Sequence, residues 1–295
     1  HVLGRTISRQ EPFEFELRVI RPSNEIIHVQ SRGWPELDRD GGVRAVFGTF
    51  LDITQRKEAE LALLEANKEL EKFAYIASHD LRSPLRAIGN LTHWISEDLE
   101  GVITDDARGK LALLRARVQR MDDMLNDILA YSRAGRISER PMAINLSELI
   151  QEQFGKLAPD AFALRLDGDL PTIRSPRGPL AQVFQNLLSN AVKHHDREAG
   201  TIEAASRHRG GFVEIAIRDD GPGIDEEYHQ KVFEMFQTLA PRDRVEGTGL
   251  GMPLIRKLVE SQGGEVWIES PAQNRGTTVK FTWPRSVYQG TEAAA

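Results

Sequence analysis

The feature that most constrains the fold is a pair of long stretches with an apolar residue at every third or fourth position. In the first stretch, the steps alternate between four and three residues along Ala59, Leu63, Ala66, Leu70, Phe73 and Ala77. In the second, the steps are again three and four along Leu111, Leu114, Val118, Met121, Leu125, Ile128 and Ser132. This seven-residue repeat predicts helices that each bury one stripe against another helix.

The two stretches are predicted to form one antiparallel hairpin. The first helix is expected from Gln55 to about Leu99, and residues 101–106 separate it from the second. A single hairpin hides its two apolar stripes poorly, so we expect two copies to pair into a four-helix bundle, a homodimer through residues 55–134. The alternative is a hairpin packed on other domains of its own chain. It is less favoured because the apolar repeat of the first helix begins upstream of the hairpin.

His79 is the candidate reactive residue of the first helix. It lies two positions past Ala77 and therefore off the seam, so its imidazole is expected to reach water. Asp80 follows directly. Pro84 cannot donate to the carbonyl of Asp80 and crowds it, which predicts a loosened or kinked helix at a cost of roughly 3 kcal/mol. These features favour a reactive site, although a lone helical histidine is more often solvated or packed.

Composition excludes several classes of protein. The 295 residues carry a net charge of −6 with no massed basic segment, so no nucleic-acid partner is expected. The absence of cysteine excludes disulfides, thiol nucleophiles and thiolate metal sites. No apolar run is long enough to span a bilayer, so we expect no membrane contact within this chain and a cytoplasmic location. Because the chain opens with His1, it can be part of a longer, membrane-attached protein.

Residues 1–54 are predicted to form a three-stranded meander. Apolar and polar residues alternate from Phe13 to Val19 and again later, and turn residues stand at 22–24 and 40–42. This segment resembles the C-terminal half of a PAS sensor domain, chiefly in the sequence from Gly48 to Thr54 that joins sensor to signalling helix in that family. The alternative is a small β appendage without a sensing role.

The polar linker from Gly135 to Pro141 lies in the expected hinge, residues 135–145, before a C-terminal domain of residues 146–285 and a tail of residues 286–295. In this domain Ser147 is predicted to cap a helix that ends near Pro159, and a strong helix is predicted from Gly178 to His195. Strands are predicted at 162–166, near Ile173, and at 202–205, 212–218, 265–269 and 277–283. The pattern predicts an α/β sandwich with one mixed sheet and helices on one face.

Two glycine loops of this domain are candidate nucleotide contacts. The sequence lacks a P-loop and the Rossmann spacing. The loop Gly247, Thr248, Gly249, Leu250, Gly251 precedes a helix with an early proline, so its N–H groups can bind a triphosphate. The loop from Asp219 through Gly221 to Gly223 carries a carboxylate that can accept a hydrogen bond from the exocyclic amine of adenine.

Three polar side chains follow one face of the strong helix. Asn186, Asn190 and Lys193 are spaced at i, i+4 and i+7 on an otherwise apolar helix. Such groups are costly there unless they meet a polar ligand. An amide oxygen suits Mg²⁺, which prefers oxygen ligands. A satisfied buried amide pair is the structural alternative.

Taken together, these segments resemble a sensor histidine kinase of two-component systems. The resemblance covers residues 55–285 with its boxes in family order: the phosphoacceptor box at 79–85, the asparagine box at 186–193, the first glycine box at 219–223, the phenylalanine box at 233–236, the second glycine box at 247–251 and the last at 276–277. It implies that the C-terminal fold is the ATP-binding (Bergerat-type) fold shared with gyrase and Hsp90-type ATPases.

The resemblance also implies roles for the site residues. His79 would attack the γ-phosphorus of ATP through Nε2, and Asp80 would hold the other ring N–H and act as base. Asn190 would bind Mg²⁺, Asn186 and Lys193 would meet phosphates, and Asp219 would recognise adenine. The remaining ATP-binding candidates are His194, Gly221, Gly223, Phe233, Arg244, Gly247, Thr248, Gly249, Leu250, Gly251 and Thr277, with residues 237–246 as a lid.

The function implied is an autokinase that passes its phosphoryl group to an aspartate of a response regulator receiver domain. Ser83 stands where many relatives have Thr or Asn, which puts a phosphatase activity in doubt. Two alternatives are a catalytically degenerate dimeric signalling scaffold and an ATPase of the same nucleotide fold. The second would leave His79 without a chemical task.

Overall fold

The computed structural model describes residues 2–135, 139–157, 161–168, 170–237, 247–270 and 275–286. The chain divides into two compact units, His1–Lys72 and Phe73–Ala295, and the boundary falls inside a long helix. Parts of the predicted hinge (136–138), lid (238–246) and tail (287–295) lie outside the described residues. Among the described residues, no helix combines the length and the apolar character that crossing a bilayer requires.

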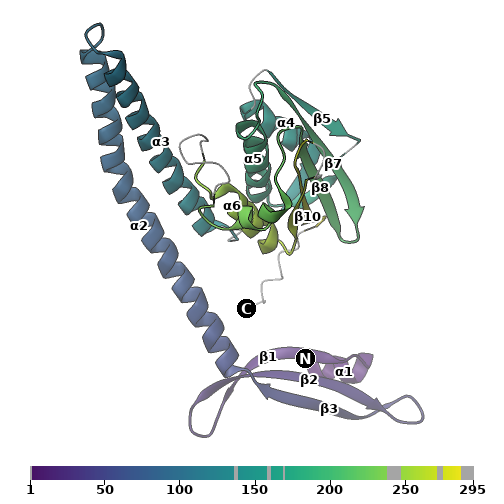
Figure 1. The fold of residues 1–295 in the computed structure, drawn as a ribbon. Coiled ribbons are helices and arrows are strands. Elements are labelled where there is room, and N and C mark those ends of the chain that lie inside the picture. The colour runs from purple at the N-terminus through teal and green to yellow at the C-terminus, as the bar shows by residue number, and fades with distance from the viewer. Residues whose placement is uncertain are drawn as a thin grey trace. The chain divides into compact units, whose positions relative to one another are not determined.

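The N-terminal unit contains the predicted meander. Strands β1 (Phe13–Ile20), β2 (Ile26–Leu37) and β3 (Val43–Asp52) form an antiparallel sheet in that order (Figure 1). The second turn is closed by the carboxylate of Asp38, which accepts hydrogen bonds from the N–H groups of Asp40 and Gly42. Helix α1 (Val2–Arg9) is not in the sequence-based prediction, because eight residues make only about two helical turns and show no extended repeat.

Helix α2 (Thr54–Asp98) carries the phosphoacceptor box and continues through Pro84 without interruption. Pro84 therefore does not end the helix, and a bend beside it stays a prediction. Helix α3 (Asp105–Arg133) begins after Thr104, whose hydroxyl accepts a hydrogen bond from the N–H of Ala107. This cap satisfies one of the first free N–H groups of the helix.

Helices α2 and α3 pair as the predicted antiparallel hairpin. Contacts at successive levels join His93 to Arg115, Gly89 to Val118, Arg82 to Asn126 and Tyr75 to Arg133. Residue numbers rise along α3 as they fall along α2, so each level of one helix has a fixed partner level on the other.

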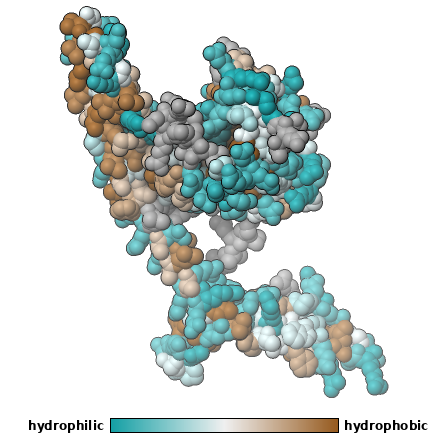
Figure 2. Space-filling view, viewed as in Figure 1, coloured by the Kyte–Doolittle hydropathy of each residue, from teal (hydrophilic) through white to brown (hydrophobic). Residues whose placement is uncertain are grey.

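The hairpin buries only one side of α2. Ser78, Leu85 and Thr92, spaced seven residues apart, are buried. The adjacent side stays apolar and exposed within the single chain, at Phe73, Leu81, Ile88, Leu91 and Ile95. Figure 2 shows hydrophobic residues along these helices. The predicted seam thus lacks a partner within the part of the chain that the structure describes.

The C-terminal domain is the predicted mixed sheet with helices on one face (Figure 1). The strands are β5 (Phe162–Asp167), β7 (Gly200–Arg209), β8 (Phe212–Asp219), β10 (Thr278–Pro284) and β9 (Val266–Glu269), in that spatial order. Only the pair β5 and β7 is parallel. The covering helices are α4 (Leu146–Leu157), α5 (Arg177–Lys193) and α6 (Gly251–Ser261), with two short 3₁₀ turns at Glu226–Tyr228 and Lys231–Phe233.

The core of this domain lies between the sheet and the three helices. Phe184 of α5 packs edge-on against Phe281, which in turn meets Trp283 of β10, and all three are fully buried. The indole N–H of Trp283 donates to the hydroxyl of buried Ser175 at 2.9 Å. The three rings thus form a continuous packed row from α5 to β10, and the buried indole donor of Trp283 is satisfied.

Two details near the hinge differ from the prediction. The strand predicted near Ile173 is β6 (Thr172–Ser175), and it pairs with β4 (Met142–Asn145) in a separate two-stranded sheet. Strand β4 lies within the segment predicted as hinge. The predicted Ser147 cap is wrong: the side chain of Asn145 accepts from the N–H groups of Ser147 and Glu148 at the start of α4.

Candidate functional site

The first half of the site is His79 on α2. Its side chain and that of Asp80 are each 72% exposed, and the ring Nδ1 lies 3.2 Å from Asp80 Oδ1. The prediction that the imidazole reaches water is confirmed. A carboxylate at Nδ1 favours the tautomer with the proton on that nitrogen, which leaves the lone pair of Nε2 directed to solvent.

A shallow depression beside His79 is partly lined by arginines. It is formed by His79, Arg82, Ser83, Arg86, Ala87 and Asn90. Arg82 spans the hairpin, with Nε 3.3 Å from Asp122 Oδ1 and Nη2 2.7 Å from Asn126 Oδ1. Arg86 makes no hydrogen bond or ion pair with any residue the structure describes, so its charge can meet an anion that approaches His79.

The second half of the site begins on α5. Asn186 and Asn190 both point toward the start of α6, where a Cβ added to Gly251 would lie 3.8 Å from Asn190 Oδ1 and 3.9 Å from Asn186 Oδ1. The amide nitrogen of Asn186 is buried and has no partner among the described residues. A buried donor without a partner costs about 1–3 kcal/mol, so this amide fits a ligand oxygen.

The same residues fit a magnesium ion held mainly by a ligand. Asn190 supplies a hard amide oxygen beside the glycines at the start of α6. The described residues contain no group of three or more His, Asp or Glu side chains that could hold a metal alone. Mg²⁺ commonly keeps waters and phosphate oxygens and takes few protein ligands, which is compatible with this sparse donor set.

Asp219, at the end of β8, is a half-buried carboxylate with a fixed orientation. Its Oδ1 accepts hydrogen bonds from the N–H groups of Gly221 at 2.9 Å and Thr277 at 3.2 Å. Burial raises the pKa of Asp219, while these two N–H groups act in the opposite direction. Its Oδ2 has no hydrogen-bond partner in the described part of the chain, so it can accept from an amine of a ligand.

The second glycine loop is shaped by its neighbours. Gly249 has φ of +73°, and a Cβ there would lie 2.8 Å from the carbonyl carbon of Phe236. Phe236 donates its N–H to the Gly249 carbonyl at 3.0 Å, which joins the phenylalanine and glycine boxes. Phe233 is buried under the guanidinium of Arg256, 4.2 Å from the ring centre. Phe233 thus packs against a side chain of α6.

Lys193 is the last residue of α5, and His194 follows it at the C-terminal cap position. The N–H of His194 donates to the Asn190 carbonyl at 3.0 Å and so caps the helix. Desolvation, and then the charge of Lys193, lower the pKa of His194. Gly223 has φ of +87° and lies against Ser270, near Gly276. Arg244 lies outside the described residues.

The structure adds two contacts that sequence reasoning did not find. Thr248 of the glycine loop hydrogen-bonds the carboxylate of Asp127 on α3. Lys257 of α6 donates to the carbonyl of Tyr131 at 2.7 Å and lies over its ring. The seam pattern indicates only that Asp127 is off the buried stripe, and nothing local to it signals a partner 121 residues away.

These contacts lie at the level of His79 along the hairpin. In α2, His79 stands between Tyr75 and Arg82, whose partners on α3 are Arg133 and Asn126. Asp127 and Tyr131 fall between those two partners. The glycine loop therefore meets the hairpin at the same level as the phosphoacceptor candidate, on the neighbouring helix.

Two family models match the chain. Residues 69–136 match the His Kinase A (phospho-acceptor) domain. Residues 176–287 match the histidine kinase-, DNA gyrase B-, and HSP90-like ATPase family.

Curated relatives match over most of the chain. It is 35% identical over 253 residues to the methanogenesis regulatory histidine kinase FilI of Methanothrix harundinacea, covering 83% of this chain and 28% of that protein. It is 30% identical over 275 residues to cyanobacterial phytochrome B of Nostoc sp., covering 88% and 36%. The chain thus spans about a third of the length of these relatives.

Solved structures show the same fold. Full-length ShkA in complex with AMPPNP aligns with a TM-score of 0.57 at 24% identity, covering 74% of this chain and 46% of that one. The histidine kinase ThkA in complex with the response regulator protein TrrA aligns with a TM-score of 0.51 at 20% identity, covering 97% and 82%.

Proposed function

The chain belongs to the sensor histidine kinases of two-component systems, and from this premise we propose that it phosphorylates its own His79 with Mg·ATP and then passes the phosphoryl group to an aspartate of a response regulator. The observation that carries the proposal is the exposed imidazole of His79, with Nδ1 at Asp80 and Nε2 open to solvent.

The transfer step uses His79 as the nucleophile and Asp80 as the base. The lone pair of Nε2 forms a bond to the γ-phosphorus, the bond from that phosphorus to the bridging oxygen breaks, and ADP leaves with the electron pair. The ring gains positive charge as this happens, and Asp80 stabilises it by accepting the Nδ1 proton. The second step reverses the bond change, because the N–P bond breaks as a carboxylate oxygen of the regulator takes the phosphoryl group.

The nucleotide is assigned to the residues that face one another on α5, at the start of α6 and at the end of β8. Asp219 Oδ2 accepts a hydrogen bond from the exocyclic amine of adenine, and the N–H groups at the start of α6 bind phosphate oxygens. Asn186 and Lys193 meet phosphates, and Asn190 contributes an oxygen to Mg²⁺. Bound there, the ion neutralises charge that develops on the phosphates during transfer.

Two partners complete the proposal. The exposed apolar side of α2 fits a second copy of this chain in a four-helix bundle. A receiver domain is the second partner, since ThkA was solved with the response regulator TrrA. The N-terminal meander is assigned to a PAS-like sensor segment. Phosphatase activity toward the regulator is not part of the proposal, because Ser83 departs from the residues that many relatives use.

The test is transfer of label from ATP to His79. Incubation with Mg²⁺ and γ-³²P-ATP should give protein-bound label that is labile in acid and stable in base. His79→Gln should abolish the label while the variant still binds ATP. His93→Gln is the matched control, since His93 is another exposed histidine of α2, and it should keep the label.

Other outcomes assign other functions. Label that survives His79→Gln would overturn the assignment of the phosphoacceptor. ATP hydrolysis without label would identify an ATPase of the same fold. ATP binding with neither label nor hydrolysis would identify a degenerate signalling scaffold.

A further inference from the structure

His195 is a buried side chain for which the proposed reaction has no use. It lies in the turn after α5, where its side chain is only 1% exposed. Its ring meets Phe162 of β5 edge-on, with 5.3 Å between centroids. A Cβ added to Gly200 would lie 2.6 Å from Nε2 of His195, so only glycine fits beside the ring at the start of β7. This close fit fixes where the ring can lie.

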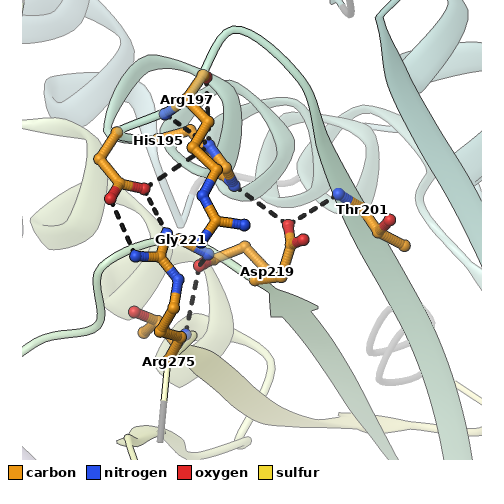
Figure 3. A network of polar contacts seen from close by, with 9 residues as sticks. His195, Arg197, Thr201, Asp219, Gly221 and Arg275 are labelled. Carbon is orange, nitrogen blue, oxygen red and sulfur yellow. Dashed lines mark hydrogen bonds and ion pairs between the residues drawn. The ribbon is translucent and has the colours of Figure 1, made fainter.

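The hydrogen bonds of His195 place a proton on Nε2. This nitrogen lies 3.0 Å from Asp220 Oδ1, and a carboxylate can only accept, so Nε2–H donates to it. Nδ1 lies 3.1 Å from the backbone nitrogen of Arg197 and 3.2 Å from the carbonyl oxygen of the same residue. Asp220 Oδ1 also accepts the N–H of Thr201 at 2.7 Å (Figure 3). Asp220 is thus held toward the start of β7.

Holding Asp220 matters because it is adjacent to Asp219. The two consecutive carboxylates stand at the end of β8 and the start of the following loop. Asp219 is the one whose free oxygen is proposed to accept a hydrogen bond from adenine. His195 also lies beside the loop, since a Cβ added to Gly221 would lie 3.4 Å from its Cδ2 and 2.9 Å from Asp219 Oδ1. Gly221 is one of the two N–H donors that orient Asp219.

The neighbouring residue supports the other donor. Asp196 forms a two-pronged ion pair with Arg275, with 3.0 Å between Arg275 Nη1 and Asp196 Oδ2 (Figure 3). Arg275 is two residues before Thr277, whose N–H also donates to Asp219 Oδ1. Both donors to Asp219 are thus supported from one turn, residues 195–196.

We propose that His195 is a positioning residue for recognition of the nucleotide base: by holding Asp220 and supporting Gly221, it keeps Asp219 Oδ2 directed at the exocyclic amine of adenine. This inference rests on the proposed function, in which Asp219 accepts from that amine, and extends it to a residue that does not touch the nucleotide. A histidine that served only to stabilise the fold would affect every nucleotide equally.

The test compares two nucleotides that differ only in the group Asp219 would contact. Calorimetry with the whole chain gives Kd values for ATP and for purine riboside triphosphate, which lacks the 6-amino group. His195→Ala should raise the Kd for ATP by roughly fivefold or more and raise the Kd for purine riboside triphosphate much less. His195→Gln restores a donor near the Nε2 position and should bind ATP nearly as wild type does. His208→Gln, an exposed histidine of β7, is the control.

Asp220→Ala removes the oxygen that accepts from His195 and Thr201, so it tests the same contact from the other side and should reproduce the selective loss, even if His195→Ala does not fold. Equal weakening of both nucleotides, or no weakening of either, would overturn the inference while leaving the proposed function intact. Failure of the wild-type chain to bind ATP at all would instead overturn the proposed function, and the inference with it.

Discussion

Thr248, in the second glycine loop, donates its hydroxyl hydrogen to the carboxylate of Asp127 on α3. The same hydroxyl oxygen accepts the N–H of Leu250 at 3.2 Å. A loop that is proposed to bind phosphate is thus docked on the phosphoacceptor hairpin through one of its own donors. Because a phosphate and a carboxylate cannot share this donor without repelling each other, we expect nucleotide binding and this docking to oppose each other.

The first prediction concerns the charge of Asp127. Asp127→Asn keeps the size of the side chain and removes the repulsion, so ATP should bind more tightly, by roughly three- to tenfold. Burial raises the pKa of Asp127, against the Thr248 hydrogen bond. As pH falls, Asp127 of the wild type should therefore become protonated before carboxylates with an ordinary pKa do. The Kd of the wild type for ATP should then approach that of the variant. Calorimetry at two pH values measures both effects.

Asp123→Asn is the matched control, since Asp123 is exposed on α3 one turn earlier. It should leave the Kd for ATP unchanged. An Asp127→Asn variant that binds ATP no better than this control would show that the docking contact and the nucleotide do not compete.

The hairpin and the mixed sheet could be predicted because their signals are local. A seven-residue repeat or an alternation of apolar residues is written within each element, and the structure confirms both. Strand β4 has four residues and exists because it pairs with β6, about 30 positions later. Four residues are too few to show an alternation, and they directly follow a polar linker, so sequence reasoning placed them in the hinge.

The candidate site could be predicted in parts but not as an arrangement. Asn186, Asn190 and Asp219 stand out because polar groups interrupt an apolar pattern. Asp127 and His195 give no such signal, since the first is an ordinary polar residue outside the apolar repeat of its helix and the second follows the end of a helix. Their partners are distant in sequence and become neighbours only through tertiary packing.

The second prediction concerns Asn190 and magnesium. Asn190→Ala removes the proposed amide ligand, so the Kd for ATP measured with Mg²⁺ should rise by about tenfold. In EDTA, where no ion is available, wild type and variant should bind ATP alike. Gln185→Ala, on the exposed side of α5, is the control and should behave as wild type does in both buffers. An equal loss with and without Mg²⁺ would assign Asn190 to direct nucleotide contact instead.

The third prediction exchanges base preference at Asp219. In Asp219→Asn the amide oxygen can still accept from Gly221 and Thr277, while an NH₂ group replaces Oδ2 and faces the donor of adenine. ATP should therefore bind about tenfold or more weakly. Inosine triphosphate, which has an acceptor oxygen at that position, should lose less or gain. Comparison of the two Kd values measures the exchange, and parallel losses would count against recognition of the 6-position by Asp219.

The fourth prediction is that Asp219→Asn changes how the free energy of unfolding depends on pH. Burial raises the pKa of Asp219 in the folded state above its unfolded value, so between those two values the folded protein holds more protons. The free energy of unfolding from this group therefore falls as pH rises through that window and stays reduced above it. Asp219→Asn should remove this dependence and make the nucleotide-free protein more stable at neutral pH. Urea unfolding at several pH values measures it.

The last prediction concerns the unpartnered side of α2. Leu81, Ile88 and Ile95 recur every seven residues and are each more than 40% exposed in the single chain. Ile88→Glu costs little in an isolated hairpin, because the carboxylate would remain in water. In a four-helix bundle it would bury an unpaired charge, so the dimer should dissociate. Asn90→Glu adds the same charge two positions away, beside the depression that contains His79, and should leave the dimer intact. Sedimentation measures both masses. A dimer that tolerates Ile88→Glu would place the interface elsewhere on the chain.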